Sequence, residues 1–502
     1  MSAVVLGALA TAFIVYITVG VVLGLRTRDV GDMLPLGFGR QARVASSAEF
    51  SASTVATTIS LATVVIAFFE LAGQFGVWLF WTVLTTSAGL LVVRLLVGRI
   101  WRRMAVYDHR PTLHEFLGTE YNSEALRYVG AACTSLGFLA AFAVELTVGS
   151  KFFAWLMPDV PQWAAVVVLS IVSFAYTAAG GFRAVIITDR IQMGSIWLLL
   201  LALPAYYAYY VWGHGGWSEL SQRLPAQTLR FVYRPGLAAF LAGIFIINVP
   251  TFISDMSVWQ RIAGAQRHET VFGGLARSVI SSAATWSLFA ILACLSFLLV
   301  AGPIEHNPLV NVMAAISDDG SPFAAVVMFL SVLGLYGAML STASTQLIAV
   351  SHTVYEDIVS RAQRRSLRER MGSRAELLKS RAILVAAALA STALVEVLSR
   401  AGFGIADLVF AIYGSQVGLC PLAIAAIILP RRQLAAMSDW AASAVSAGFV
   451  IGWAGAAFGV AAGYDDLVFL SPMFSLLVSA CLLGLGFVIS GAWRKPDVSC
   501  PD

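Results

Sequence analysis

Stretches of about 20 consecutive apolar residues recur along the 502-residue chain, and this pattern limits the fold more than any other feature. A helix of that length can cross the hydrocarbon core of a bilayer. Only 12% of the residues are charged, against about 25% in ordinary soluble domains. We therefore predict an all-α, polytopic membrane protein with roughly 13 transmembrane helices in a lipid bilayer. The predicted spans lie near 4–25, 46–68, 75–97, 127–150, 162–179, 186–212, 236–262, 272–301, 322–352, 380–398, 403–429, 437–462 and 467–491.

Basic residues in the predicted loops indicate how the helices cross the membrane. Arginines follow the odd-numbered spans and acidic residues follow spans 8 and 12, whereas the loop after span 6 is an exception. The residues after odd-numbered spans include Arg26, Arg28, Arg99, Arg102, Arg103, Arg431 and Arg432. The acidic residues after spans 8 and 12 include Asp318, Asp319, Asp465 and Asp466. The loop after span 6 carries Arg223, Arg230 and Arg234. This predicts a multi-pass protein of the cell (inner) membrane with its N-terminus outside and its C-terminus in the cytoplasm. The net charge of +4 is small and the arginines cluster in loops, so no nucleic-acid partner is expected.

A cluster of small polar side chains lies within the ninth predicted span. Its members are Ser341, Thr342, Ser344, Thr345 and Gln346. Inside a membrane each of these groups needs a partner. Hard cations take oxygen ligands, so adjacent hydroxyls and a few backbone carbonyls could hold a sodium ion and release it again. The alternative is small-residue packing between helices, with Ser and Thr bonded back onto their own helix.

The second predicted span carries a threonine-rich run, SASTVATTISLATVV, at Ser51–Val65. These residues stabilise a helix poorly, so the run can tolerate a break whose carbonyls face a cavity or an ion. A Thr-rich helix–helix interface is the alternative. In the seventh span, Pro250 is expected to kink the helix, so that Asn248, Thr251 and Ser254 could line a binding cavity.

Several charged residues fall within the predicted spans, where charge is costly and marks candidate functional positions. They include Arg94, Glu145, Asp189, Asp255 and Asp407. Asp189 lies at the cytoplasmic start of the sixth span, where an ion would leave. For each residue, an ion pair that holds two helices together is at least as good an explanation. The sequence contains no phosphate-binding loop, nucleophile motif or metal-ligand spacing, so enzyme activity is not predicted.

Four separated motifs resemble the sodium/solute symporter family, which includes the proline permease and the sodium/sugar cotransporters. They are TLHEFLGTEY at 112–121, YTAAGGFRAVIITDRIQ at 176–192, WQRIAGA at 259–265 and LSTASTQLIAVSHTVYEDI at 340–358. The resemblance implies a LeuT-like core of two inverted five-helix repeats. It divides the chain into a first helix and link (1–44), a first repeat (45–212), a second repeat (213–429) and two peripheral helices with a short tail (430–502).

The resemblance also implies a sodium site between the second and ninth spans. Carried over residue by residue, its ligands are the carbonyls of Ala56, Ile59 and Ala338 and the hydroxyls of Ser341 and Thr342. Asp189 corresponds to an aspartate on the ion exit path. The predicted substrate site comprises Thr58, Thr63, Asn248, Thr251, Asp255, Tyr413 and Gln346.

The sequence departs from the family pattern at three of these positions. Thr58 stands where the family often has Asp or Asn, and Thr251 and Tyr413 stand near the positions of a gating tyrosine and a glutamine in the sugar transporters. A sugar substrate is therefore not supported. The prediction is a sodium-coupled symporter that imports a small organic solute by alternating access. The alternatives are a proton-coupled carrier on the same fold and a non-transporting membrane sensor module.

Overall fold

The structure is a computed structural model that describes residues 2–37, 43–299, 307–361, 367–370, 373–400 and 405–492. The long helices are α1 (Ser2–Gly24), α5 (Phe80–Met104), α7 (Glu124–Leu156), α8 (Gln162–Gly213), α14 (His268–Leu295), α16 (Pro322–Thr353), α19 (Arg374–Arg400), α23 (Ser438–Ala462) and α24 (Asp465–Ile489). The shorter ones are α2 (Val30–Met33), α3 (Ser47–Thr58), α4 (Ala67–Phe75), α6 (Leu113–Glu120), α9 (Trp217–Leu220), α10 (Ala226–Leu229), α11 (Leu237–Asn248), α12 (Thr251–Ser254), α13 (Met256–Ala263), α15 (Pro308–Asp319), α18 (Leu367–Arg370), α20 (Ile405–Gln416), α21 (Cys420–Ile428) and α22 (Arg431–Ala436). Segments η2 (Leu61–Ile66) and η6 (Val354–Ser360) are π-helical, and η3 (Gly76–Leu79), η4 (Ser221–Arg223), η5 (Ser296–Leu298) and η7 (Val417–Leu419) are 3₁₀-helical.

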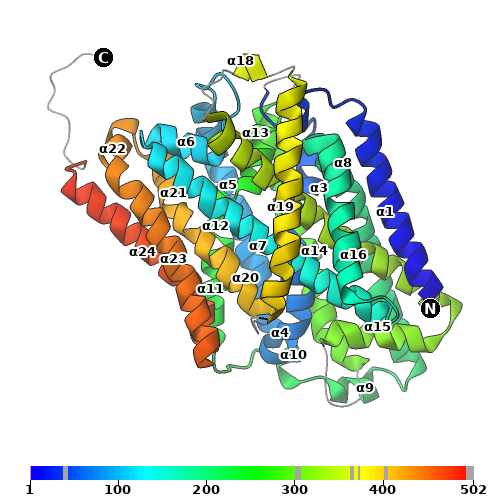
Figure 1. Cartoon of the computed structure of the whole chain (residues 1–502). Helices are drawn as coiled ribbons and strands as arrows, with labels where there is room; N and C mark the ends of the chain where they lie inside the picture. The colour runs from blue at the N-terminus through cyan, green and yellow to red at the C-terminus, as the bar shows by residue number, and fades with distance from the viewer. Residues whose placement is uncertain are drawn as a thin grey trace.

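The long helices lie side by side and form a single bundle (Figure 1). The N-terminus lies toward the end of the bundle that carries α9 and α10, whereas α24 ends toward the other end, near α22 (Figure 1). The predicted tail after residue 492 lies outside the described residues. The division of the chain into two repeats, and the side of the membrane on which each terminus lies, stay predictions.

Eleven helical segments of the described chain are long and apolar enough to cross a membrane. Two of them, Leu61–Met104 and Gln162–Gly213, have 44 and 52 residues. At about 1.5 Å per residue each is far longer than the roughly 30 Å of hydrocarbon in a bilayer. Gly76 (φ 52°) and Gly181 (φ 62°) turn the backbone inside them. The chain is therefore a multi-pass membrane protein, and the count of 13 crossings remains a prediction that agrees with a division at these two glycines.

The break predicted in the threonine-rich span is present. α3 ends at Thr58, and the next two residues, Ile59 (φ −99°, ψ 83°) and Ser60 (φ −85°, ψ 147°), leave the helical conformation. The hydroxyl of Thr58 donates to the carbonyl of Val55 at 2.8 Å, a local bond that competes with the helical pattern. Helical structure resumes as η2 and α4.

The seventh predicted span is also interrupted, first beside Pro250 as predicted and again at Asp255. α11 ends at Asn248, two residues before Pro250, which itself keeps helical angles (φ −78°, ψ −29°). The chain becomes extended at Asp255 (φ −75°, ψ 115°), whose carboxylate accepts from the N–H of Ser257 at 2.6 Å and Val258 at 3.4 Å. Asp255 therefore begins α13 as its N-cap, because a carboxylate satisfies the free N–H groups of a first turn.

α16 lies in the middle of the bundle and is buried continuously from Gly334 to Thr353. Its glycines bring it unusually close to α8. A Cβ atom placed on Gly334 would lie 2.5 Å from Leu199 Cβ, and one on Gly337 would lie 2.3 Å from Ser195 Oγ. Only glycine permits this approach, so the small residues of α16 do serve helix packing on the face toward α8.

Candidate functional site

The break after α3 lies against the hydroxyl cluster of α16. Ser341 Oγ lies 2.9 Å from the carbonyl oxygen of Ala56 and 2.8 Å from that of Ala338, and its one O–H can donate to either. Thr342 Oγ1 is 3.4 Å from the carbonyl of Thr57 and 3.3 Å from that of Ala338. Both hydroxyls are buried. The structure thus gathers uncharged oxygens from two helices at the point where one of them is broken.

Four of the five residues predicted to bind sodium meet at this junction. The fifth, Ile59, is the first residue outside α3, and its N–H still bonds to the carbonyls of Val55 and Ala56 at 3.2 and 3.3 Å. The carbonyl of Thr57, which also lies near Thr342, was not among the predicted ligands. The threonine run indicated the break but not which carbonyl would face α16.

The other side of the break faces an acidic side chain that comes from α7. Ser60 Oγ donates to Glu145 Oε1, and the backbone N–H groups of Leu61 and Ala62 also interact with this carboxylate. Glu145 is fully buried. A broken helix exposes carbonyls at one end and N–H groups at the other. Here the carbonyl end meets hydroxyls and the N–H end meets a carboxylate.

Asp189 takes part in a buried ion pair. It accepts from Arg261 Nη2 at 3.1 Å and from the hydroxyl of Ser53. Arg261 also donates to Thr345 Oγ1 at 3.0 Å and to the carbonyl of Ser257 at 2.9 Å. The pair therefore connects α3, α8, α13 and α16 next to the hydroxyl cluster. This is the helix-holding ion pair that the sequence analysis gave as the alternative, whereas the predicted role on an ion path stays a prediction.

A cavity of about 130 Å³ lies between the two interrupted segments. All seven residues predicted to bind substrate line it: Thr58, Thr63, Asn248, Thr251, Asp255, Gln346 and Tyr413. Aromatic side chains of Phe68, Phe138, Phe252 and Trp286 supply part of the wall. The wall also includes Thr342, so the cavity and the hydroxyl junction are adjacent. An apolar cavity with a few convergent polar groups is typical of a small-molecule site.

Two polar contacts shape the lining of this cavity. Asn248 Nδ2 donates to Thr85 Oγ1 at 3.0 Å, and Gln346 Nε2 lies 3.4 Å from the hydroxyl of Tyr413. The pairing of Gln346 with Tyr413 joins α16 to α20. The aromatic residues of the wall were not predicted from the sequence, because Phe and Trp are common on any membrane helix.

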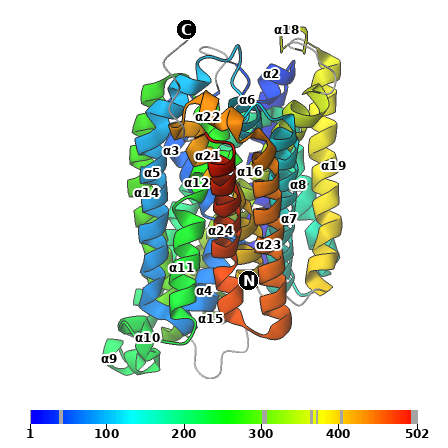
Figure 2. The ribbon, with the colours of Figure 1, turned by 90° about the vertical axis from the view of Figure 1, so that its left-hand side faces the viewer.

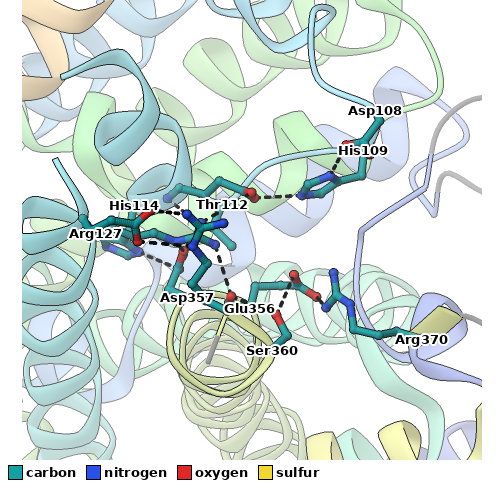
Figure 3. Close-up of polar contacts among 12 residues, drawn as sticks. Asp108, His109, Thr112, His114, Arg127, Glu356, Asp357, Ser360 and Arg370 are labelled. Carbon is teal, nitrogen blue, oxygen red and sulfur yellow. Dashed lines mark hydrogen bonds and ion pairs between the residues drawn. The ribbon is translucent and has the colours of Figure 1, made fainter. Parts of the chain in front are cut away.

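A second polar network joins α6 and α7 to the end of α16, and it unites two of the motifs quoted above (Figure 3). Asp357 accepts from Thr112 Oγ1 at 2.8 Å and from Arg127 Nε at 2.9 Å, and it lies 3.3 Å from His114 Nδ1. Its neighbour Glu356 accepts from Arg370 at 2.6 Å. Both carboxylates are buried in the π-helical segment η6. The network holds α16 to the two helices beside it at one end of the bundle.

His109 lies at the edge of this network, in the loop after α5 (Figure 3). Its ring nitrogens are 2.7 Å from Asp108 and 2.8 Å from Glu115. Burial disfavours the charged ring, but the hydrogen bond and charge of Glu115 and the bond to Asp108 outweigh it and raise the pKa of His109 to about 9.

This pKa predicts how stability changes with pH. Because the pKa in the folded protein is above the ordinary value near 6.5, the stabilisation is complete below about pH 6.5 and is lost as the pH rises through about 9. We expect a loss of roughly 2–3 kcal/mol across that window. Thermal unfolding of the wild type and of His109→Gln between pH 6 and 10 checks this. Parallel pH profiles for the two proteins would contradict it.

No protein-family model and no curated protein sequence matches the chain, but solved structures do. A Na⁺-coupled sialic acid symporter, in a substrate-bound outward-open state, aligns with a TM-score of 0.73 at 16% identity and covers 98% of each chain. Mhp1, a nucleobase-cation-symport-1 family transporter in a closed conformation, aligns with a TM-score of 0.56 at 14% identity, covering 92% of this chain and 95% of Mhp1. A manganese transporter of Eremococcus coleocola aligns with a TM-score of 0.52 at 15% identity, covering 89% and 94%.

The chain has the LeuT-like transporter fold. The predicted fold class is thereby confirmed. At 14–16% identity the likeness concerns the fold alone, and the ions and substrates of these neighbours are properties of those proteins. Within this LeuT-like fold the two interrupted segments, α3–η2 and α12–α13, flank the cavity described above.

Proposed function

We propose that the protein is a sodium-coupled symporter that imports a small organic solute by alternating access, and that it belongs to the sodium/solute symporter family. The observation that carries this proposal is the junction where Ser341 and Thr342 meet the carbonyls at the end of α3. Such a set of neutral oxygens suits a monovalent cation, because it provides ligands without the charge that would retain the ion. The Na⁺-coupled sialic acid symporter, which has the same fold, supports the choice of ion.

In this proposal sodium binds the hydroxyls of Ser341 and Thr342 and the carbonyls of Ala56, Ile59 and Ala338. The hydroxyls already point at two of these carbonyls, so they need only turn their protons away to become ligands. The ion then ties α3 to α16 beside the cavity. Ion and substrate assist each other because each binds best when that wall is ordered.

The proposed substrate site is the adjacent cavity, and sodium leaves past Asp189. We place the protein in the cell membrane with its N-terminus outside and its C-terminus in the cytoplasm, as the loop charges indicate.

A screen for ligand-dependent stabilisation tests the proposal and identifies the substrate. The purified protein is heated with small acids, amino acids, ureides and sugars, each in sodium and in potassium. A solute that raises the apparent Tm only in sodium supports the proposal, since a ligand that binds only the folded state stabilises it. Sodium-gradient-driven uptake of that solute into proteoliposomes must follow, whereas binding without accumulation would favour the sensor alternative.

A proton-coupled carrier on the same fold is favoured by one observation. Glu145 is a fully buried carboxylate inside a membrane-spanning helix, and within the described part of the chain its contacts are with a hydroxyl and with N–H groups rather than with a basic side chain. Intramembrane acids are common proton carriers. Uptake that is driven by a pH gradient and does not depend on sodium would favour the proton-coupled carrier.

We expect Glu145→Ala to destabilise the protein by about 1–3 kcal/mol, because the hydroxyl of Ser60 and the N–H groups behind it lose their acceptor in a buried place. Glu145→Gln keeps an acceptor oxygen and should lose less. The measurement is thermal unfolding in detergent, with the exposed Glu396→Gln as control. If Glu145→Ala unfolds like the control, the carboxylate does not stabilise the break.

A further inference from the structure

A second cavity, of about 530 Å³, is lined by residues from the end of α5 and from α6, α21 and α22. Figure 2 shows α6, α21 and α22 at one end of the bundle. It is separate from the proposed transport site and shares no lining residue with it. Four guanidinium groups and one carboxylate provide its polar lining: Arg99, Arg102, Arg103, Arg431 and Glu120. We call it the arginine groove.

Two of the four arginines form the fixed part of the groove. Arg103 donates to Glu120 at 2.8 Å and to the carbonyl of Leu429 at 2.6 Å. Arg431 donates to the other oxygen of Glu120, also at 2.8 Å. Glu120 is only 1% exposed, and its single negative charge is shared by Arg103 and Arg431. The groove therefore keeps an excess of positive charge.

The other two arginines supply this excess. Arg99 and Arg102 are exposed on the last turns of α5, and no acidic side chain in the described part of the chain pairs with them. Arg102 Nε donates to the carbonyl of Gly98 at 3.2 Å, which leaves its two terminal nitrogens for a ligand. Guanidinium groups bind oxyanions in a planar, bidentate manner. The matching ligand chemistry is a phosphate group.

The surroundings distinguish between a soluble phosphate and a lipid headgroup. Leu91 and Leu95 are 43% and 71% exposed and lie four residues apart on α5, in line with Arg99. Ile428 and Val106, 51% and 68% exposed, belong to the groove itself. An exposed apolar stripe thus leads directly into a basic groove at the end of a membrane-spanning helix. A molecule with acyl chains and an anionic head matches both parts.

We propose that the arginine groove binds the headgroup of an anionic phospholipid, with its acyl chains along the Leu91–Leu95 stripe. Arg99 and Arg102 contact the phosphate, and the Arg103–Glu120–Arg431 cluster holds α6 and α22 in place around it. Basic pockets between membrane helices bind lipid headgroups in this way.

Native mass spectrometry of the purified full-length chain tests the proposal, with phosphatidylglycerol and phosphatidylcholine as the added lipids. Phosphatidylglycerol should bind more tightly than phosphatidylcholine. The double variant R99Q/R102Q should bind phosphatidylglycerol about ten- to thirty-fold more weakly, as expected for the loss of two arginines near a membrane surface. Both side chains are exposed, so folding should be unaffected.

The matched control is R26Q/R28Q, which removes the same charge from exposed positions just after α1. It should change phosphatidylglycerol binding less than two-fold. An equal loss in the two double variants would overturn the proposal, since binding would then follow net charge alone. Displacement of the lipid by millimolar inorganic phosphate would also overturn it and would reassign the groove to a soluble anion.

Discussion

Replacing Thr342 with alanine is expected to lower the affinity of the protein for sodium about ten- to hundred-fold. The proposed site has five oxygen ligands, and removal of a hydroxyl in contact with a charged group costs about 1.5–3 kcal/mol. The hydroxyl lies 3.4 Å from the carbonyl of Thr57, so its loss also weakens the connection between α16 and the broken end of α3. The measurement is the sodium concentration at half-maximal thermal stabilisation, which requires no knowledge of the substrate.

Two variants on the same helix make this result specific. Thr342→Ser keeps the hydroxyl and should stay within about three-fold of the wild type. Ser344→Ala removes a buried hydroxyl that bonds back to the carbonyl of Ser341 at 3.2 Å, and it should leave sodium titration unchanged. If Thr342→Ala titrates like the wild type, the ion site is not at this junction.

Replacing Arg261 with glutamine is expected to be the most destabilising change considered, at about 3–5 kcal/mol. Removal of one partner leaves Asp189 as an uncompensated charge in a fully buried position. The change also removes the donors to Thr345 and to the carbonyl of Ser257, so four helices lose a shared contact. Thermal unfolding in detergent, compared with the wild type at one heating rate, reports the loss.

The double variant D189N/R261Q separates the cost of an isolated buried charge from the cost of the lost hydrogen bonds. It removes both charges and should recover a substantial part of the stability, because replacing both partners avoids the isolated charge. The exposed pair Arg400–Glu396 is the matched control, with side chains that are 79% and 67% exposed. Arg400→Gln should cost less than about 1 kcal/mol. Equal losses for Arg261→Gln and Arg400→Gln would show that the buried pair does not hold the helices.

Local chemistry explains which parts of the site the sequence could predict. The break after Thr58 was foreseeable because side-chain hydroxyls compete with helical backbone bonds within a few residues. The end of α11 beside Pro250 was foreseeable because proline lacks the N–H group that a continuing helix requires. The further interruption at Asp255 was not predicted, because this N-cap residue looks like an isolated charge in an apolar span.

The remaining parts of the site depend on contacts between distant segments. Glu145 is 85 residues from Ser60, and Arg127 is 230 residues from Asp357, so no periodicity could pair them. The resemblance to known transporters supplied the fold, and the residues predicted to bind substrate all line one cavity. It gave no indication of the arginine groove, because exposed arginines after a membrane span are expected in any case.

The glycine contacts between α16 and α8 have a mechanical consequence. Two helices that touch at backbone distance cannot shift along each other without first moving apart, so they behave as one stiff frame. Ser341 and Thr342 sit on that frame and keep their positions. Any rearrangement that opens the cavity must then be made by α3–η2 and α12–α13, whose backbones already leave the helical conformation at Ile59 and Asp255. The moving parts of the molecule would be its two broken segments, whereas three of the five proposed sodium ligands, Ala338, Ser341 and Thr342, would stay in place on α16.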